Sequence, residues 1–364
     1  MTTSDRVRPV LQAVLITISA FAAMLILTNL PLFSLLELKG LDFLFRLRGP
    51  LASPSEIVVV AIDEPSFAEI PKQWPWPRSL HARLIDQLKK AGARVIGFDI
   101  LFAEASQAEE DRALARAIQE AGNVVLATER SVIADALFRQ TIRVDPIEPF
   151  MLTALVGVAT LPIDPDGTVR RPLPLSPDLP SFSSQIVRLY LGQGRHGIRT
   201  DPSKAILINH FGPPRTIKTV SYYQALEADR MLPPRTFTDK IVLIGRALQA
   251  PPEPQRTAPD VFPTPFSFDA GGPTAGVEIH ATIVANLLAG QMVNEPSPVM
   301  RYGLLFLLVL MGSLATLRLK PFWALGAIIG LSALFLVIAY VLFAKGRLWL
   351  PIFSGTVQFG LVYG

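Results

Sequence analysis

Long apolar stretches at both ends of the 364-residue chain enclose a middle region in which apolar and polar positions alternate. The long stretches cover residues 10–36, 299–317, 322–344 and 348–364. A helix needs about 20 predominantly apolar residues to cross a bilayer. The pattern therefore predicts four transmembrane helices, one before the middle region and three after it, with the last one ending where the chain ends.

The first apolar stretch also has features of a secretory signal peptide. Two arginines, Arg6 and Arg8, precede it, and residues 20–22 (Ala-Phe-Ala) resemble a cleavage site. The apolar stretch nevertheless continues well beyond that site. We therefore expect an uncleaved anchor at residues 10–36, with residues 1–9 in the cytoplasm.

Short runs rich in Val and Ile recur in the first half of the middle region, at residues 57–63, 94–100 and 124–127. Strands that are buried on both faces of a parallel sheet have this composition. Two amphipathic stretches with helical spacing, residues 79–91 and 108–121, separate the three runs. This order of strand and helix is half of a doubly wound sheet.

The pattern changes after the third run. Residues 155–161 and 168–173 flank an Asp-Pro-Asp-Gly sequence at 164–167, which predicts an antiparallel hairpin. The remaining predicted elements are a helix over 181–191, strands over 205–209 and 240–245, and a last helix over 276–288. The expected fold class is α/β, a mostly parallel doubly wound sheet with an antiparallel insertion, joined to the four transmembrane helices.

Composition narrows the classes of function. Hydrophobic residues make up 50% of the chain and charged residues 18%, which fits a protein that lies partly in lipid. The net charge of +4 comes from scattered Lys and Arg without a basic run, so we expect no nucleic-acid partner. The chain has no cysteine, which excludes disulfides, cysteine-ligated zinc and thiol chemistry.

Acidic residues end two of the predicted strands. Asp63 and Asp99 end two predicted strands that we expect to be adjacent, so both carboxylates are expected at the carboxyl edge of the sheet, where α/β proteins bind ligands. Together with Glu64 and Arg78 they form the predicted ligand site, which would suit a cation or a polar ligand. The alternative is structural, with the carboxylates capping helices and pairing with Arg78 or a backbone amide.

The other motifs predict neither a cofactor nor a metal. Residues 192–197 match Gly-x-Gly-x-x-Gly, but they follow a predicted helix, whereas a dinucleotide-binding fingerprint follows a strand. The Asp-Pro-Asp-Gly sequence lacks the later acidic ligand of a calcium loop, and the four histidines have no metal-ligand spacing. Residues 74–77, Trp-Pro-Trp-Pro, predict a rigid turn that either packs as a corner or stacks on a ligand.

The sequence resembles the type-two CHASE domain, a cyclase/histidine-kinase-associated sensory extracellular domain, over residues 37–297. The matching segments, in order, are residues 57–64, 74–78 with 81–82, 97–102, 164–170, 240–245, 264–266, 276–281 and 287–290. One N-terminal span, this domain and three further spans is also the family's usual layout. The resemblance implies a multi-pass receptor of the bacterial inner membrane whose residues 37–297 lie in the periplasm or outside the cell.

The resemblance also sets the expected function. The chain would detect an unknown periplasmic ligand and pass the signal to a cytoplasmic output C-terminal to Gly364. In the family that output is most often an adenylate or guanylate cyclase, and less often a kinase or diguanylate cyclase. The chain itself would not be an enzyme, and we expect a homodimer. Helix 276–288 is expected to transmit the signal to the span that follows it.

Two other functions remain open from the sequence. An extracytoplasmic hydrolase or metal-dependent enzyme would use Asp63 and Asp99, although the sequence shows no nucleophile–base pair. A dimerisation or interaction module would use the Pro-rich segment 251–265 as its contact surface.

Overall fold

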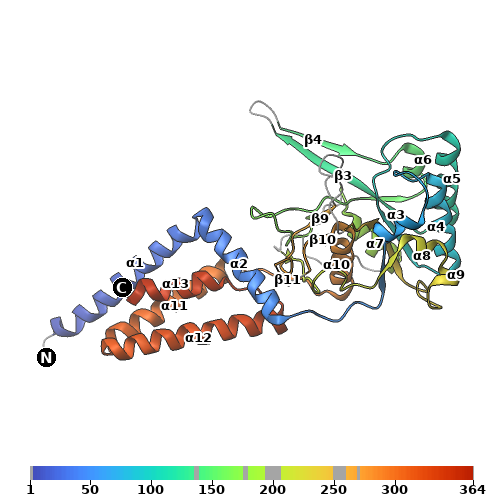
Figure 1. Ribbon diagram of the computed structural model, residues 1–364. Coiled ribbons are helices and arrows are strands. Elements are labelled where there is room, and N and C mark those ends of the chain that lie inside the picture. Colours follow the sequence, from blue (N-terminus) through green and yellow to red (C-terminus); the bar gives the residue numbers. More distant parts are fainter. Residues whose placement is uncertain are drawn as a thin grey trace. The chain divides into compact units, whose positions relative to one another are not determined.

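The structure is a computed structural model, which describes residues 3–134, 139–174, 179–192, 206–248, 260–268 and 271–363 (Figure 1). The chain divides into two compact units. Met1–Gly49 together with Val293–Gly364 form the first, called here the helical unit. Pro50–Met292 form the second, called here the α/β unit. Each unit is described by itself.

Among the described residues of the helical unit, two or at most three segments are long and apolar enough to cross a membrane, so the four predicted spans are confirmed only in part. Its elements are α1 (Thr3–Thr28), α2 (Pro31–Arg48), β11 (Val293–Asn294), α11 (Pro298–Arg318), α12 (Pro321–Gly346) and α13 (Ile352–Tyr363). Within the described part of the chain, α11 and α12 are long and apolar enough to cross a membrane. The α1–α2 pair adds a third span only if its two helices, bent by 84°, count as one.

The predicted span at 10–36 is not one continuous helix, because the helix breaks before Pro31. Proline has no backbone N–H and favours the first turn of a new helix, where α2 begins. Thr28 and Asn29 both donate side-chain hydrogen bonds to the Leu25 carbonyl, at 3.0 and 2.6 Å, and so satisfy the end of α1.

In the predicted span at 348–364 the helix starts later than the apolar stretch does. The amide of Trp349 donates to the Asn294 carbonyl at 3.0 Å, and the Asn294 amide donates to the Arg347 carbonyl at 2.8 Å. This pairing holds the first residues of the stretch extended, so α13 begins at Ile352 and then follows the apolar stretch to Tyr363. Gln358 was expected to face other helices rather than lipid, and its side chain is fully buried within the unit.

The α/β unit is built on one sheet with strand order β4-β3-β2-β8-β1-β7, and β5 also pairs with β3. The strands are β1 (Ile57–Ile62), β2 (Val95–Asp99), β3 (Val124–Ala134), β4 (Arg139–Val144), β5 (Leu155–Val158), β7 (Thr219–Ser221) and β8 (Ile241–Arg246). All pairings are parallel except that of β3 with β4. The mostly parallel α/β sheet predicted from the sequence is confirmed.

Helices cover both faces of this sheet (Figure 1). They are α3 (Glu64–Glu69), α4 (Arg78–Lys90), α5 (Ala108–Ala121), α6 (Glu148–Met151), α7 (Phe182–Leu191), α8 (Tyr222–Leu226), α9 (Ala228–Met231) and α10 (Gly276–Ala289). Successive residues of β1 alternate between two apolar clusters: Val58 and Val60 pack with α4, α5 and α8, whereas Ile57 and Val59 pack with α7 and α10. Short strands β6 (Ile206–Leu207), β9 (Val261–Phe262) and β10 (Thr274–Ala275) complete the unit.

The predicted hairpin over 155–161 and 168–173 is wrong. Residues 155–158 form β5, which pairs in parallel with β3, and residues 168–173 are not a strand. The turn itself exists, since the Gly167 amide donates to the Asp164 carbonyl at 2.9 Å. The carboxylates of this turn bind the fully buried Arg170 instead of forming a hairpin turn between two paired strands. The antiparallel pairs among the described strands are β3–β4 and β9–β10. Of the Gly-x-Gly-x-x-Gly motif, Gly192 ends α7, while residues 193–197 lie outside the described part.

Candidate functional site

The carboxyl edge of the parallel sheet carries polar residues on three neighbouring strands. Asp63 follows β1, Asp99 ends β2 and Arg246 ends β8. The prediction that Asp63 and Asp99 end adjacent strands is wrong, because β8 pairs with both β1 and β2 and lies between them. The two carboxylates therefore belong to separate environments.

Asp63 is the N-cap of α3. Its buried carboxylate accepts hydrogen bonds from the amide and hydroxyl of Ser66 at 3.1 and 2.6 Å, and from the Ser221 hydroxyl at 2.7 Å. Arg215 adds an ion pair at 3.9 Å. This arrangement satisfies the first turn of α3 and ties it to the start of α8. It matches the structural alternative, although the cationic partner is Arg215 rather than Arg78.

Arg78 serves the packing of α4 on α5. Its guanidinium donates hydrogen bonds to the Asp111 carboxylate and to the Glu104 carbonyl. The guanidinium also lies 5.1 Å from the ring centre of Phe150, and its side chain is mostly buried. Glu64, the fourth predicted residue, is the first residue of α3 and is half-buried. The structure thus separates Arg78 and Asp63 from Asp99.

Asp99 has a different partner, Asp260, which the sequence analysis did not select. Burial raises the pKa of Asp99 to about 7, and burial together with the charge of Asp99 raises the pKa of Asp260 to about 7. Both residues are half-buried. Among the described residues, no hydrogen bond reaches the Asp99 carboxyl, so it is available for a proton or a ligand.

Two glycines make room for this carboxyl pair at the start of α10. A Cβ at Gly276 would lie 2.9 Å from Asp260 Oδ1, and a Cβ at Gly245 would lie 3.2 Å from the Asp99 Cβ. The Gly276 amide donates to the Asp260 carbonyl at 3.0 Å. The positive end of the α10 dipole also faces Asp260, which favours a negative charge there. A Cβ at Gly245 would also lie 2.6 Å from the Val277 Cβ, so Asp260 contacts the first residue of α10 and Asp99 lies beside a strand residue that packs on the second.

Arg246 and His280 act electrostatically on Asp260, and the indole of Trp74 lies next to Arg246. The charge of Arg246 lowers the pKa of Asp260 against the effect of burial, and its guanidinium lies 5.9 Å from the ring centre of Trp74. The buried Arg246 Nε has no hydrogen-bond partner among the described residues. Burial lowers the pKa of His280 to about 4, so the ring is neutral at pH 7. Its Nε2 donates to the Ala159 carbonyl at 2.8 Å, and its Nδ1 accepts from the Ser183 hydroxyl at 3.1 Å.

This chemistry suits binding better than catalysis. Both nitrogens of His280 are engaged by Ser183 and the Ala159 carbonyl, so it cannot act as a free base toward Asp99. Within the described residues, no three His, Asp or Glu side chains lie together as metal ligands would. Two carboxyl groups beside a guanidinium and an indole can exchange a proton or bind a polar ligand.

The Trp-Pro turn behaves mainly as a packing corner. Trp76 is buried, and its ring centre lies 4.9 Å from that of Tyr222 and 5.2 Å from that of Phe67. Trp74 is half-buried and packs edge-on against Trp76 at 5.5 Å. Its contact with Arg246 is the one feature that places this turn beside the carboxyl pair.

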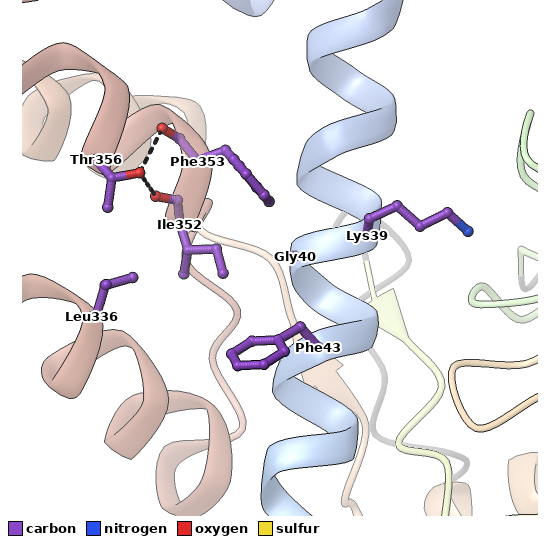
Figure 2. A pocket seen from close by; sticks show the side chains of 7 residues that line it. All are labelled: Lys39, Gly40, Phe43, Leu336, Ile352, Phe353 and Thr356. Carbon is purple, nitrogen blue, oxygen red and sulfur yellow. Dashed lines mark hydrogen bonds between the residues drawn. The ribbon is translucent and has the colours of Figure 1, made fainter. Parts of the chain in front are cut away.

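A cavity of about 390 Å³ lies elsewhere, in the helical unit between α2, α12 and α13 (Figure 2). Its lining residues are Lys39, Gly40, Phe43, Leu336, Ile352, Phe353 and Thr356. The lining is mostly apolar, and the Thr356 hydroxyl donates back to the Ile352 and Phe353 carbonyls, at 2.9 and 3.2 Å. The amine of Lys39 pairs with Asp42 at 3.6 Å, so the carboxyl pair remains the candidate site.

Comparison with known protein families shows to which family the chain belongs. The model of the CHASE2 domain matches residues 17–317, more than half of the sequence. The chain belongs to the CHASE2 domain family. The resemblance found in the sequence is thereby confirmed, and CHASE2 domains are sensory extracellular domains, not catalytic ones. A search of curated proteins and a search of solved structures each returned no match.

The CHASE2 match covers the whole α/β unit and with it every residue of the candidate site. Sequence reasoning missed Asp260 and Arg246. Arg246 could have been found, because it ends an apolar strand just as Asp99 does. Asp260 gave no comparable signal, because it reaches the site only through the pairing of β9 with β10 at the start of α10.

Proposed function

We propose that this CHASE2 chain is the sensor and membrane-anchor part of a bacterial transmembrane receptor. The α/β unit lies on the outer side of the inner membrane and detects a periplasmic stimulus. The helices of the helical unit anchor it and pass the signal to a cytoplasmic output, for which we expect an adenylate cyclase. The family match and the two long apolar helices, α11 and α12, support this proposal.

The carboxyl pair of Asp99 and Asp260 is the ligand site in this proposal. The single observation that carries it is that two carboxyl groups share one environment in which burial holds the pKa of each near 7. A proton or a polar ligand that binds there changes the repulsion between them and the fit of Gly276 at the start of α10. Along the chain, the end of α10 leads through Gly290 and β11 to α11, which gives the signal a covalent route to the membrane.

The proposal gives a structural role near the site to the other predicted residues, Asp63, Glu64 and Arg78. Asp63 and Arg78 fix α3 and α4, the helices that follow β1 and precede β2 along the chain. A homodimer is proposed with the receptor function, because a signal that crosses a membrane through helices is commonly passed by a change in how two copies pack. A hydrolase using Asp63 and Asp99 is not favoured, because β8 separates the two.

The test joins a reporter cyclase to the chain after Gly364 and measures its output in cells over a range of periplasmic pH values and added polar solutes. We expect Asp99→Asn to remove or shift the response, because it removes one ionisable carboxyl from the pair. Glu109→Gln is the matched control, since Glu109 is an exposed acid on α5. A response in Asp99→Asn identical to that of the parent, with normal amounts of protein, would show that the pair is not the sensing site.

A further inference from the structure

A carboxylate of α2 caps the first turn of α13 inside the helical unit. The Ser354 amide donates to Glu37 Oε1 at 2.5 Å, and the Phe353 amide donates to Oε2 at 3.2 Å. The Ser354 hydroxyl donates to the same carboxylate. Both Glu37 and Ser354 are buried. Amides of the first helical turn have no partner within their own helix, so Glu37 supplies what α13 lacks.

Close packing surrounds this cap. A Cβ at Gly40, one turn further along α2, would lie 2.9 Å from Ile352 Cγ1 and 3.1 Å from Phe353 Cδ2, so only glycine lets the helices approach this closely. Figure 2 shows Gly40 on α2 facing Ile352 and Phe353 on α13. One turn after Ile352, a Cβ at Gly355 would overlap the ring of Phe335 in α12. Close packing against α2 and against α12 therefore holds the first turn of α13 in place.

The positions of α2 and α13 along the chain indicate what the Glu37 cap could do. At its C-terminal end α2 passes through Gly49 into Pro50, the first residue of the α/β unit. α13 is the last helix of the printed sequence. A rigid contact between α2 and α13 therefore joins the helix that leads into the α/β unit directly to α13. This connection does not pass through α11 or α12.

We propose that Glu37 locks α2 and α13 into one body, and that this body carries displacement from the α/β unit to the end of the chain. The hydrogen bonds inside a low-dielectric helical unit are strong because no water competes for the α13 amides. Removal of the carboxylate leaves the buried Ser354 amide and the partly buried Phe353 amide without their acceptor, which favours separation of the helix ends. The transmitting role rests on the proposed receptor function, whereas the lock itself does not.

Spin labels test the lock directly, because the chain has no native cysteine. Cysteines replace Ser34 on α2 and Leu361 on α13, both exposed, and the distance between the labels is measured in the whole chain in lipid nanodiscs. The parent should give one narrow distance. Glu37→Leu should broaden or shift it, and Ser354→Ala, which removes only the hydroxyl donor, should do so to a smaller extent. A second pair at Met311 and Leu334, on α11 and α12, should not change and reports that the unit is still folded.

An unchanged narrow distance between α2 and α13 in Glu37→Leu would overturn the lock, whatever the function of the chain. The reporter fusion tests transmission separately. There, Glu37→Gln should uncouple output from stimulus, because one carboxylate acceptor is lost, whereas Ser34→Ala on the exposed face of α2 should respond like the parent. If the labels show the lock to be broken in Glu37→Gln and the reporter still responds fully, the route through α2 and α13 is wrong while the receptor function stands.

Discussion

Replacement of Arg170 by methionine is expected to destabilise the α/β unit by about 3–5 kcal/mol, because it breaks a buried ion-pair cluster from one side. The Arg170 side chain is 0% exposed and forms ion pairs with Asp164 at 3.0 Å and with Asp166 at 2.7 Å. Methionine fills the space but leaves two nearly buried carboxylates without this cation. Hydrogen exchange of the sheet amides in the whole chain, measured by mass spectrometry, reports the loss of stability.

A matched surface pair provides the control for Arg170. Arg143 pairs with Asp145 at 2.7 Å, but the two side chains are 43% and 30% exposed, so Arg143→Met should cost less than about 1 kcal/mol. Asp164→Asn combined with Asp166→Asn should recover part of the stability of Arg170→Met, because it removes the buried charges. Equal effects of Arg170→Met and Arg143→Met would contradict a structural role for the buried cluster.

The second large expected effect is a decrease in the free energy of unfolding of the α/β unit as pH rises through 7. The folded pKa values of Asp99 and Asp260 are about 7, above their ordinary value of 3.8, so the folded state holds protons that the unfolded state has released. Their contribution to stability is complete below about pH 4 and is lost as pH rises through 7. Between pH 6.5 and 8.5 we expect a decrease on the order of 1 kcal/mol, since each pKa unit corresponds to about 1.36 kcal/mol.

Two buried histidines act in the opposite direction at lower pH. Burial lowers the pKa of His81 and of His280 to about 4, so their contribution is present above pH 6.5 and is lost as pH falls through 4. Above pH 6.5 the remaining histidine contribution is the same in the parent and in Asp99→Asn, so the difference between the two chains isolates the carboxyl pair. In hydrogen-exchange measurements Asp99→Asn should flatten the slope in that window, whereas the exposed Glu109→Gln should keep it. A flat profile in the parent would contradict a shared protonated environment.

Elements with a strong local signal were predicted well. Helix α5 occupies the predicted residues 108–121, because a clear apolar face and the left-handed Gly122 define its extent. α10 extends the predicted 276–288 by one residue, up to the left-handed Gly290. β1 and β8 follow their apolar runs for the same reason, since a strand buried on both faces needs Val, Ile and Leu throughout.

Features that depend on distant parts of the chain could not be predicted from local pattern. β8 lies between β1 and β2 although it follows them by more than a hundred residues, and no local pattern encodes that order. The pairing of Asp99 with Asp260 follows from this arrangement and from the packing of α10. The break between α1 and α2 had a local signal, the Asn-Leu-Pro sequence at 29–31, but the continuous apolar composition of residues 10–36 concealed it.

Cysteine accessibility tests the central claim, that the α/β unit senses outside the cytoplasmic membrane, most directly. Single cysteines are placed at Glu109, exposed on α5, and at Lys320, exposed between α11 and α12, in a chain that otherwise has none. Intact cells are then treated with a thiol reagent that cannot cross the cytoplasmic membrane. We predict labelling at position 109 in intact cells and labelling at position 320 only after the membrane is opened. Labelling at position 320 alone, or equal labelling at both positions in intact cells, would contradict an extracytoplasmic sensor.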